Sequence, residues 1–154
     1  MSKKYAKFLP SSENFELENF PFYWITQVHS KYVLNLDHVL KKHGVDNSRR
    51  RLLVALSTSP DASVSDLSEM IVSKMSTTTK IVYRLKDEGM VDTYSCENDA
   101  RITRVVLTEK GVEMTKKIND LMSVVLEQTF EGLTPLQIEK MMDCLKHLFK
   151  NLSH

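Results

Sequence analysis

Glycine and proline are scarce in this chain of 154 residues, which contains four of each. Because both residues interrupt helices, their scarcity predicts a mainly helical protein. No run of about 18 or more apolar residues is present, so we expect no transmembrane helix and no membrane partner. The first residues, MSKKYAKFLPSSENFE, lack the apolar core and the small-residue cleavage site of a secretory signal. We therefore expect the protein to be cytoplasmic.

Sequence motifs of enzymes and of metal sites are also missing. The chain has no glycine-rich phosphate loop, no GxSxG and no HExxH, so we do not expect an enzyme. The two cysteines, Cys96 and Cys144, form no CxxC pair, and no two histidines are separated by three residues. We therefore expect free thiols, no metal site and no cofactor.

The formal net charge is +1, so the chain has no overall excess of basic residues. This balance argues against a broad, non-specific coat of nucleic acid. It leaves open a local contact surface, because the placement of individual Lys and Arg side chains sets the electrostatic field there.

The stretch from Val64 to Gly111 contains the patterns of a helix, a turn, a second helix and a β-hairpin. Ser65 precedes an acidic residue, which is typical of a helix start, and Gly89 ends the second helix after about Glu88. Two β-type runs follow, at residues 90–95 and 102–107, with a polar tip between them. This order predicts a winged helix-turn-helix, in which one helix enters the DNA major groove beside a small antiparallel β wing. Val64 is a candidate for a short third strand of that wing.

The second of these helices has an apolar side, formed by Ile81, Val82 and Leu85, and a polar N-terminal half. Short hydroxyls and a lysine reach phosphates and base edges, although the same side chains also suit a solvated helix face. The residues that we predict as base or phosphate contacts are Ser76, Thr77, Thr79 and Lys80. The further candidates for phosphate contacts are Lys74, Arg84 and Arg104.

The residues DARITRVVLTEKG, from Asp99 to Gly111, resemble the wing signature of the MarR family of bacterial transcription regulators, which reads DxR followed by VxLTxxG. Residues 86–91 also resemble the family's junction between recognition helix and wing. The resemblance implies that Arg101 reaches into the minor groove and that Asp99 holds it through an ion pair. A narrow minor groove attracts arginine electrostatically, which suits this residue type. The chain departs from the family at Thr78, where a hydrophobic residue usually faces the core.

Amphipathic patterns flank the winged segment on both sides. Residues 21–43 form one predicted helix, and two more follow after Thr108 and after Thr134-Pro135. Their apolar stripes exceed what one winged domain can cover, so we predict a homodimer that these helices hold together. The predicted organisation is an N-terminal arm and dimerisation helix (1–44), a winged helix-turn-helix (45–110) and C-terminal dimerisation helices (111–154).

Asp46 or Asn47 is predicted to cap a helix whose first turn contains three consecutive arginines, Arg49 to Arg51. Arg50 falls near the apolar face formed by the leucines that follow, whereas Arg49 and Arg51 are expected to be exposed. An inward guanidinium needs an anionic partner, either a protein carboxylate or a ligand carboxylate. The alternative is that Arg50 extends to solvent or to a DNA phosphate.

Aromatic residues of the first predicted helix suit a small-molecule pocket, although core and dimer packing explains most of them equally well. The candidates for ligand contacts are Trp24, His29, Tyr32 and Arg50. The resemblance implies a repressor that a small aromatic or phenolic ligand releases from a pseudo-palindromic operator, and Arg50 favours a carboxylate. The alternatives are a ligand-independent regulator and a protein-binding adaptor with degenerate DNA binding.

Overall fold

The computed structural model describes residues 3–153, so residues 1–2 and 154 of the predicted terminal segments lie outside the described part. The described chain is mainly helical with a two-stranded antiparallel sheet, and the predicted fold class is confirmed. Two short 3-10 helices, Lys3–Phe8 and Leu17–Asn19, precede α1 (Pro21–Lys41), α2 (Asn47–Thr58), α3 (Val64–Met70) and α4 (Met75–Asp87). The remaining elements are β1 (Val91–Ser95), β2 (Thr103–Leu107), α5 (Glu109–Thr129) and α6 (Pro135–Leu152).

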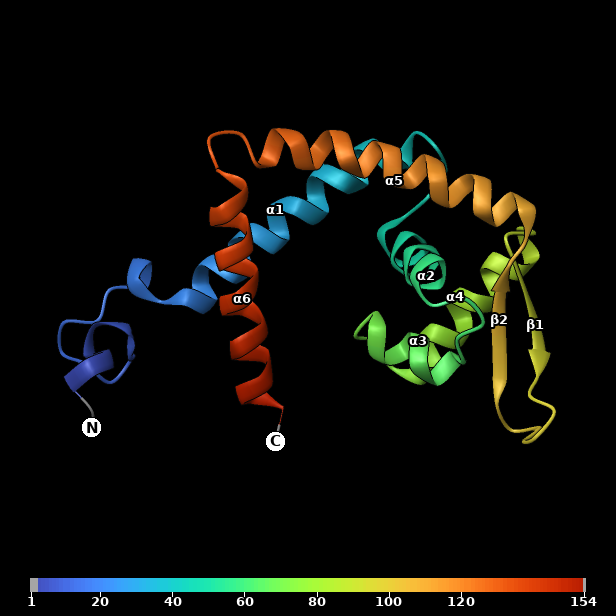
Figure 1. The fold of residues 1–154 in the computed structure, drawn as a ribbon, viewed down its shortest axis with the longest axis horizontal. Helices are drawn as coiled ribbons and strands as arrows, with labels where there is room; N and C mark the ends of the chain where they lie inside the picture. Colours follow the sequence, from blue (N-terminus) through green and yellow to red (C-terminus); the bar gives the residue numbers. More distant parts are fainter. Residues whose placement is uncertain (1–2, 154) are drawn as a thin grey trace.

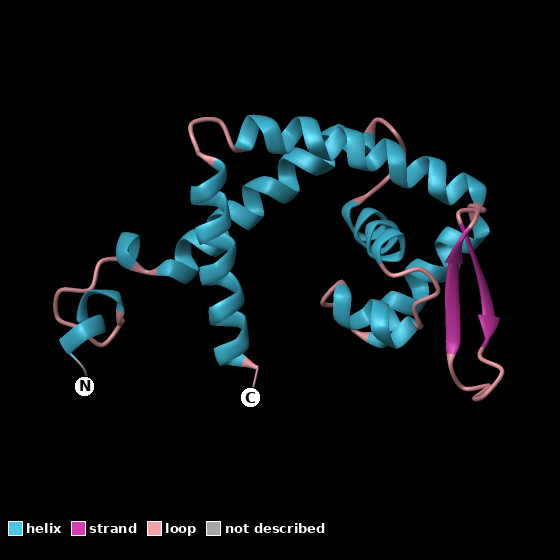
Figure 2. Cartoon of the chain, viewed as in Figure 1, coloured by secondary structure: helices cyan, strands magenta, loops and turns pink. Residues whose placement is uncertain are grey.

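The elements divide into two regions that α5 connects (Figure 1). Helices α2, α3 and α4 gather with the β1–β2 hairpin at one end, and we call this region the winged lobe. Helix α5 starts where β2 ends, passes over α2 and continues along the C-terminal half of α1. Figure 2 shows the two strands as a ribbon at the outer edge of the winged lobe, which leaves the tip of the wing free of other elements.

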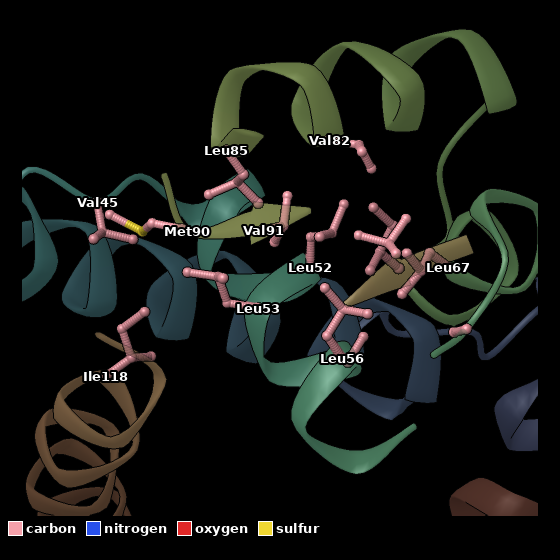
Figure 3. Close-up of a cluster of buried hydrophobic side chains, with 14 of the residues drawn as sticks. Val45, Leu52, Leu53, Leu56, Leu67, Val82, Leu85, Met90, Val91 and Ile118 are labelled. Atoms are coloured by element: carbon pink, nitrogen blue, oxygen red, sulfur yellow. The ribbon is translucent and has the colours of Figure 1, made fainter. Parts of the chain in front are cut away.

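The core of the winged lobe forms because each element contributes one apolar face. Leucines of α2 occupy the centre, and residues from α3, α4, both strands and α5 pack around them (Figure 3). Each large aliphatic side chain that is fully buried contributes about 1.5–3 kcal/mol of transfer free energy. The core residues that carry most of this burial are Leu52, Leu53, Leu56, Leu67, Val82, Leu85, Val91, Val105 and Ile118.

The wing forms where the sequence predicts it, within one residue at each strand start. Val91 pairs with Leu107 at one end of the hairpin, and Ser95 pairs with Thr103 at the other. Gly111 allows α5 to start tight against this sheet, because a Cβ at this position would overlap the backbone carbonyl of Met90. The last glycine of the wing signature therefore fixes how α5 leaves the winged lobe.

Side-chain caps start α2, α5 and α6 at the predicted residues. Asp46 accepts a hydrogen bond from the Arg49 backbone N–H, and Thr108 accepts one from Gly111. Thr134 caps α6 in the same way, with Pro135 as the first helical residue. Each such cap satisfies a backbone donor that the helix itself leaves without a partner.

The predicted start of α3 at Ser65 is wrong by two residues, because Ser63 is the N-cap. The Ser63 hydroxyl accepts from the Asp66 backbone N–H at 3.0 Å, and the Asp66 carboxylate accepts from the Ser63 backbone N–H at 3.0 Å. Hydrogen bonds that the side chain and the backbone N–H of Ser63 donate to the Asp66 carboxylate lower the pKa of this carboxyl. The charged carboxylate therefore stabilises the fold at neutral pH, and its contribution is lost as the pH falls through that lowered pKa.

The short third strand predicted at Val64 is also wrong. Val64 is the first residue of α3, so its backbone has turned into the helix. Only an isolated bridge between Ser63 and Arg104 extends the sheet, beside a hydrogen bond from Val105 N to the Ala62 carbonyl at 3.0 Å.

Ser63→Ala is expected to lower the free energy of unfolding by about 1 kcal/mol, because it removes the α3 cap. Ser65→Ala is the matched control: Ser65 is exposed and has no capping role, so its replacement should change the free energy little. Urea unfolding at pH 7 measures both values. An equal effect of the two substitutions would contradict the assignment of the cap.

Helix α6 has no buried residue within the chain, and α1 buries only Leu36 and Leu40. The exposed apolar side chains of α6 are Leu136, Met141, Met142, Leu145, Phe149 and Leu152. No helix among residues 3–153 is long and apolar enough to cross a membrane.

Candidate DNA-binding surface and ligand site

Helix α4 presents a polar face to solvent and an apolar face to the core. Thr78 is fully buried, and its hydroxyl donates to the Lys74 carbonyl at 3.1 Å, so this polar residue in the core is satisfied. It therefore occupies the inward position where the family usually has a hydrophobic residue. At the N-terminal end of α4 the exposed predicted contacts are Lys74, Ser76, Thr77 and Lys80, whereas Thr79 is half-buried.

Tyr83 also lies on the outer face of α4, with 58% of its surface exposed. The prediction from sequence named only hydroxyl and basic residues of this helix as contacts and did not include Tyr83. Its spacing could have revealed it, since Ser76, Lys80, Tyr83 and Asp87 follow one another at i, i+4, i+7 and i+11, opposite buried Thr78.

The wing tip carries the ion pair that the family resemblance implies. Arg101 donates through Nε to Asp99 Oδ1 at 3.1 Å and through Nη2 to Asp99 Oδ2 at 3.1 Å. The Asp99 carboxylate also accepts the Arg101 backbone N–H, and these bonds lower the pKa of Asp99. The Arg101 side chain is otherwise 90% exposed, so Asp99 orients a guanidinium that stays available to an external partner.

Helix α4 and the wing border a hollow of about 360 Å³, which we call the helix–wing hollow. Its lining includes Met75, Thr79 and Tyr83 from α4, and Arg101 from the wing. The predicted major-groove helix and the predicted minor-groove arginine therefore face the same side of the winged lobe.

Arg84, a predicted phosphate contact, is engaged within the chain. Its guanidinium lies 3.4 Å from Asp46 Oδ2 and 3.6 Å from Glu88 Oε1, although 59% of the side chain remains exposed. Contact with a phosphate would require these pairs to be shared or broken.

Arg104 is likewise held by its neighbours, because its Nη1 donates to the Asp61 carbonyl at 2.9 Å. It also lies beside Cys96, a free cysteine in the wing. Backbone hydrogen bonds from Asn98 and Asp99, together with Arg104, lower the pKa of the Cys96 thiol. Arg104 therefore joins the tip end of the wing to the segment before α3 in this structure.

The predicted exposure of Arg49 and Arg51 is wrong. Arg49 is 9% exposed, and its Nη1 donates to Glu88 Oε1 at 2.5 Å while its Nη2 donates to the Gly44 carbonyl at 2.7 Å. Arg51 is half-buried and donates to the Ile71 carbonyl. Both arginines turn inward because they satisfy acceptors at the ends of neighbouring helices, which helical periodicity alone does not reveal.

The Arg49–Glu88 pair joins the start of α2 to the end of α4. Burial lowers the pKa of the Arg49 guanidinium, but the hydrogen bond to Glu88 and the charges of Asp46 and Glu88 outweigh burial, so the net shift is upward. Arg49 Nε and Glu88 Oε2 are buried without a hydrogen-bond partner among the described residues. The two side chains therefore share one hydrogen bond, from Nη1 to Oε1, and the pair is not bidentate.

Arg50 faces inward between α1 and α5, which agrees with the first of the two alternatives from the sequence and not with extension to solvent or DNA. Its guanidinium carbon lies 5.9 Å from the centroid of the Tyr32 ring, and Nη1 lies 3.8 Å from Met122 Sδ. Its hydrogen bonds go to the neutral amide oxygen of Asn47, at 2.6 Å from Nη2 and 3.1 Å from Nε. Burial lowers the pKa of Arg50, with partial compensation from Tyr32 and Asp37. No carboxylate of the described residues forms an ion pair with this buried cation within 4.0 Å.

Trp24 and His29, the other predicted ligand contacts, are exposed on the N-terminal half of α1. The Trp24 indole N–H donates to the Glu18 carbonyl at 2.8 Å, which ties it to the N-terminal arm. Trp24 lies eight residues before Tyr32, or about 12 Å along the helix, and is not brought to Arg50 within one chain. The structure therefore brings Tyr32 to Arg50 and leaves Trp24 apart from them, whereas His29 lies on α1 about one turn before Tyr32.

The chain is similar to known transcription regulators over most of its length. Residues 47–103 match the family model described as the MarR family. The HTH-type transcriptional repressor IacR of Pseudomonas putida is 38% identical over 93% of this chain and 86% of its own length. A MarR-family transcriptional regulator from Silicibacter pomeroyi has a TM-score of 0.82 at 23% identity, covering 90% of this chain and 94% of that one. BpsR of Bordetella bronchiseptica, whose DNA binding is regulated by 6-hydroxynicotinic acid, has a TM-score of 0.74 at 17% identity, covering 82% and 96%.

Proposed function

The chain belongs to the MarR family of transcription regulators, and from this premise we propose that it is a repressor that binds a pseudo-palindromic DNA operator as a homodimer. The observation that carries the proposal is the common orientation of α4 and Arg101 around the helix–wing hollow. Helix α4 enters the major groove, and Arg101 enters the adjacent minor groove. The predicted DNA contacts in this arrangement are Lys74, Ser76, Thr77, Thr79, Lys80, Arg84, Asp99, Arg101 and Arg104.

A homodimer accounts for the apolar surface that α1 and α6 leave uncovered. The six exposed apolar residues of α6 named above lie on a helix that packs against little of its own chain. Burying such a surface against a second copy follows from the hydrophobic effect, and two-fold symmetry then presents two α4 helices to two half-sites. The proposed organisation keeps residues 45–110 as the DNA-binding unit, with residues 1–44 and 111–154 forming the dimer.

The proposed effector is a small aromatic carboxylate that Arg50 and Tyr32 bind. A buried arginine whose hydrogen-bonded protein partner is a neutral amide retains a net charge that an anionic ligand neutralises. Tyr32 adds an aromatic face next to the guanidinium. The regulation of BpsR by 6-hydroxynicotinic acid shows that such an acid can control DNA binding on this fold. Trp24 joins the site only if a second copy brings it there, whereas His29 lies about one turn before Tyr32 on α1 of the same chain.

DNA binding to the promoter region beside the protein's own gene tests the proposal directly. Fluorescence anisotropy at a fixed ionic strength of about 0.15 M is measured with and without benzoate, phenylacetate and hydroxybenzoates. Binding that one acid abolishes supports the ligand-responsive repressor. Binding that no acid changes supports the ligand-independent alternative, and a protein that binds no duplex supports the adaptor alternative.

Arg50→Ala is expected to remove the response to carboxylates while DNA binding in their absence stays intact. In the wild type the effector should weaken operator binding roughly 5–150-fold, the usual range for coupling between two sites. In the variant the change should fall below about twofold, because the carboxylate loses its anchor. Arg50→Met, which preserves side-chain length without charge, is the matched variant. A normal response in both variants would show that Arg50 does not anchor the ligand.

A further inference from the structure

The proposed recognition helix has few of the side chains that usually distinguish bases by paired hydrogen bonds. Arginine or lysine binds guanine in this way, and asparagine or glutamine binds adenine. Helix α4 contains no asparagine and no glutamine, and its one arginine, Arg84, is paired with Asp46 and Glu88. Lys86 donates to Thr93, so Lys80 is the exposed lysine of α4 that remains for such a contact. Helix α3, with the sequence VSDLSEM, contains none of these residue types.

Beside its polar residues, the outer side of α4 also carries apolar surface. Tyr83 is 58% exposed and Met75 is 52% exposed, and both line the helix–wing hollow together with Thr79. These three residues recur at intervals of four and therefore form one stripe along the helix. Large apolar side chains exposed on a surface that meets a partner are typical of contact residues.

We propose that α4 recognises thymine through its C5 methyl group, with the Tyr83 ring as the main contact and Met75 as the second. This inference rests on the proposed DNA-binding function and adds the chemistry of the bases that are read. In the major groove the thymine methyl is the one apolar feature of the base edges, so it is the natural partner for an apolar stripe. Because the stripe borders the hollow with Arg101, the thymine lies on the wing side of each half-site.

Operators obtained by selection from a random duplex library provide the test. Each thymine of one half-site is replaced in turn by deoxyuracil, which differs only by the missing C5 methyl. For the wild type, one such replacement is expected to weaken binding about fourfold, the effect of leaving one buried methyl uncontacted. Thymines outside the reach of the stripe should tolerate replacement, and they serve as internal controls.

Two variants of the exposed Tyr83 assign the contact. Tyr83→Ala should bind the thymine operator roughly tenfold more weakly, as expected for a central aromatic contact, and should not distinguish thymine from deoxyuracil. Tyr83→Phe keeps the ring and removes the hydroxyl, so it should retain the distinction. Circular dichroism melting confirms that both variants fold like the wild type.

The possible failures are distinguishable. A wild type that selects no duplex overturns the proposed function and this inference with it. A wild type that binds thymine and deoxyuracil operators equally, or selects half-sites without thymine, overturns the methyl contact alone. Unchanged methyl dependence in Tyr83→Ala overturns the assignment to Tyr83, and loss of that dependence in Tyr83→Phe assigns the effect to the hydroxyl and overturns the ring contact.

Discussion

Replacing Arg101 with alanine is expected to weaken operator binding roughly 100-fold without changing the unfolding transition. The fold should be unaffected because the side chain is 90% exposed and its described ion pair is with Asp99, two residues away. The DNA effect is expected to be large because the proposed homodimer inserts Arg101 twice, and losing about tenfold at each half-site multiplies to about 100-fold. Fluorescence anisotropy at constant salt measures the affinities.

Asp99→Asn is the matched control for the Arg101 substitution. The amide oxygen can still accept the Arg101 backbone N–H, but the charge that orients the guanidinium is gone. We expect a loss of about threefold, well below that of Arg101→Ala, because an oriented arginine pays less entropy on binding. If Arg101→Ala binds the operator as tightly as the wild type, the wing does not read DNA and the proposed arrangement is wrong.

The wing was predictable because its determinants are local. Both strands, the turn residues between them and the Thr108 cap all lie within the segment from Met90 to Gly111, so one short stretch of sequence contains the whole pattern. The N-cap of α3 was harder, because Ser63 and Ser65 both precede Asp66. The choice depends on which serine can accept from the residue three positions later, and only Ser63 has Asp66 at that spacing.

The three arginines of α2 show where local pattern stops being sufficient. Helical periodicity placed Arg50 near the apolar side, and the structure places it there. Periodicity gave the wrong exposure for Arg49, because the partner of this residue, Glu88, lies 39 residues further along the chain. Periodicity fixes the direction in which a side chain leaves its helix, but only tertiary structure supplies the acceptor that makes burial of a charge tolerable.

Tyr83 was missed for the opposite reason. Aromatic residues are usually assigned to the core, yet on α4 the inward positions are already filled by Thr78, Val82 and Leu85. An aromatic residue on the outer face is informative because burial does not explain it. The polar face that begins with Ser76 and Lys80 reaches Tyr83 at the next helical turn, so following this spacing would have placed Tyr83 among the DNA-contact candidates.

Arg49→Ala is expected to lower the free energy of unfolding by about 2–3 kcal/mol, which is the largest loss of stability that we predict for a single substitution. The substitution removes the partner of Glu88 and leaves a carboxylate with a buried oxygen at the end of α4. It also leaves the Gly44 carbonyl without the Arg49 donor at the start of α2. The value lies below the roughly 3–5 kcal/mol of fully buried pairs because the Glu88 side chain is 30% exposed and water can partly replace the guanidinium.

Arg84→Ala separates this effect from the loss of any positive charge near Glu88. Arg84 pairs with the same carboxylate and with Asp46, but its side chain is 59% exposed, so its loss should cost less than about 1 kcal/mol. Urea unfolding of both variants at one protein concentration makes the comparison, since the apparent stability of the proposed dimer depends on concentration. Equal losses would mean that Glu88 responds to net charge alone. A clearly larger loss in Arg49→Ala would show that the buried contact between α2 and α4 holds the recognition helix in place.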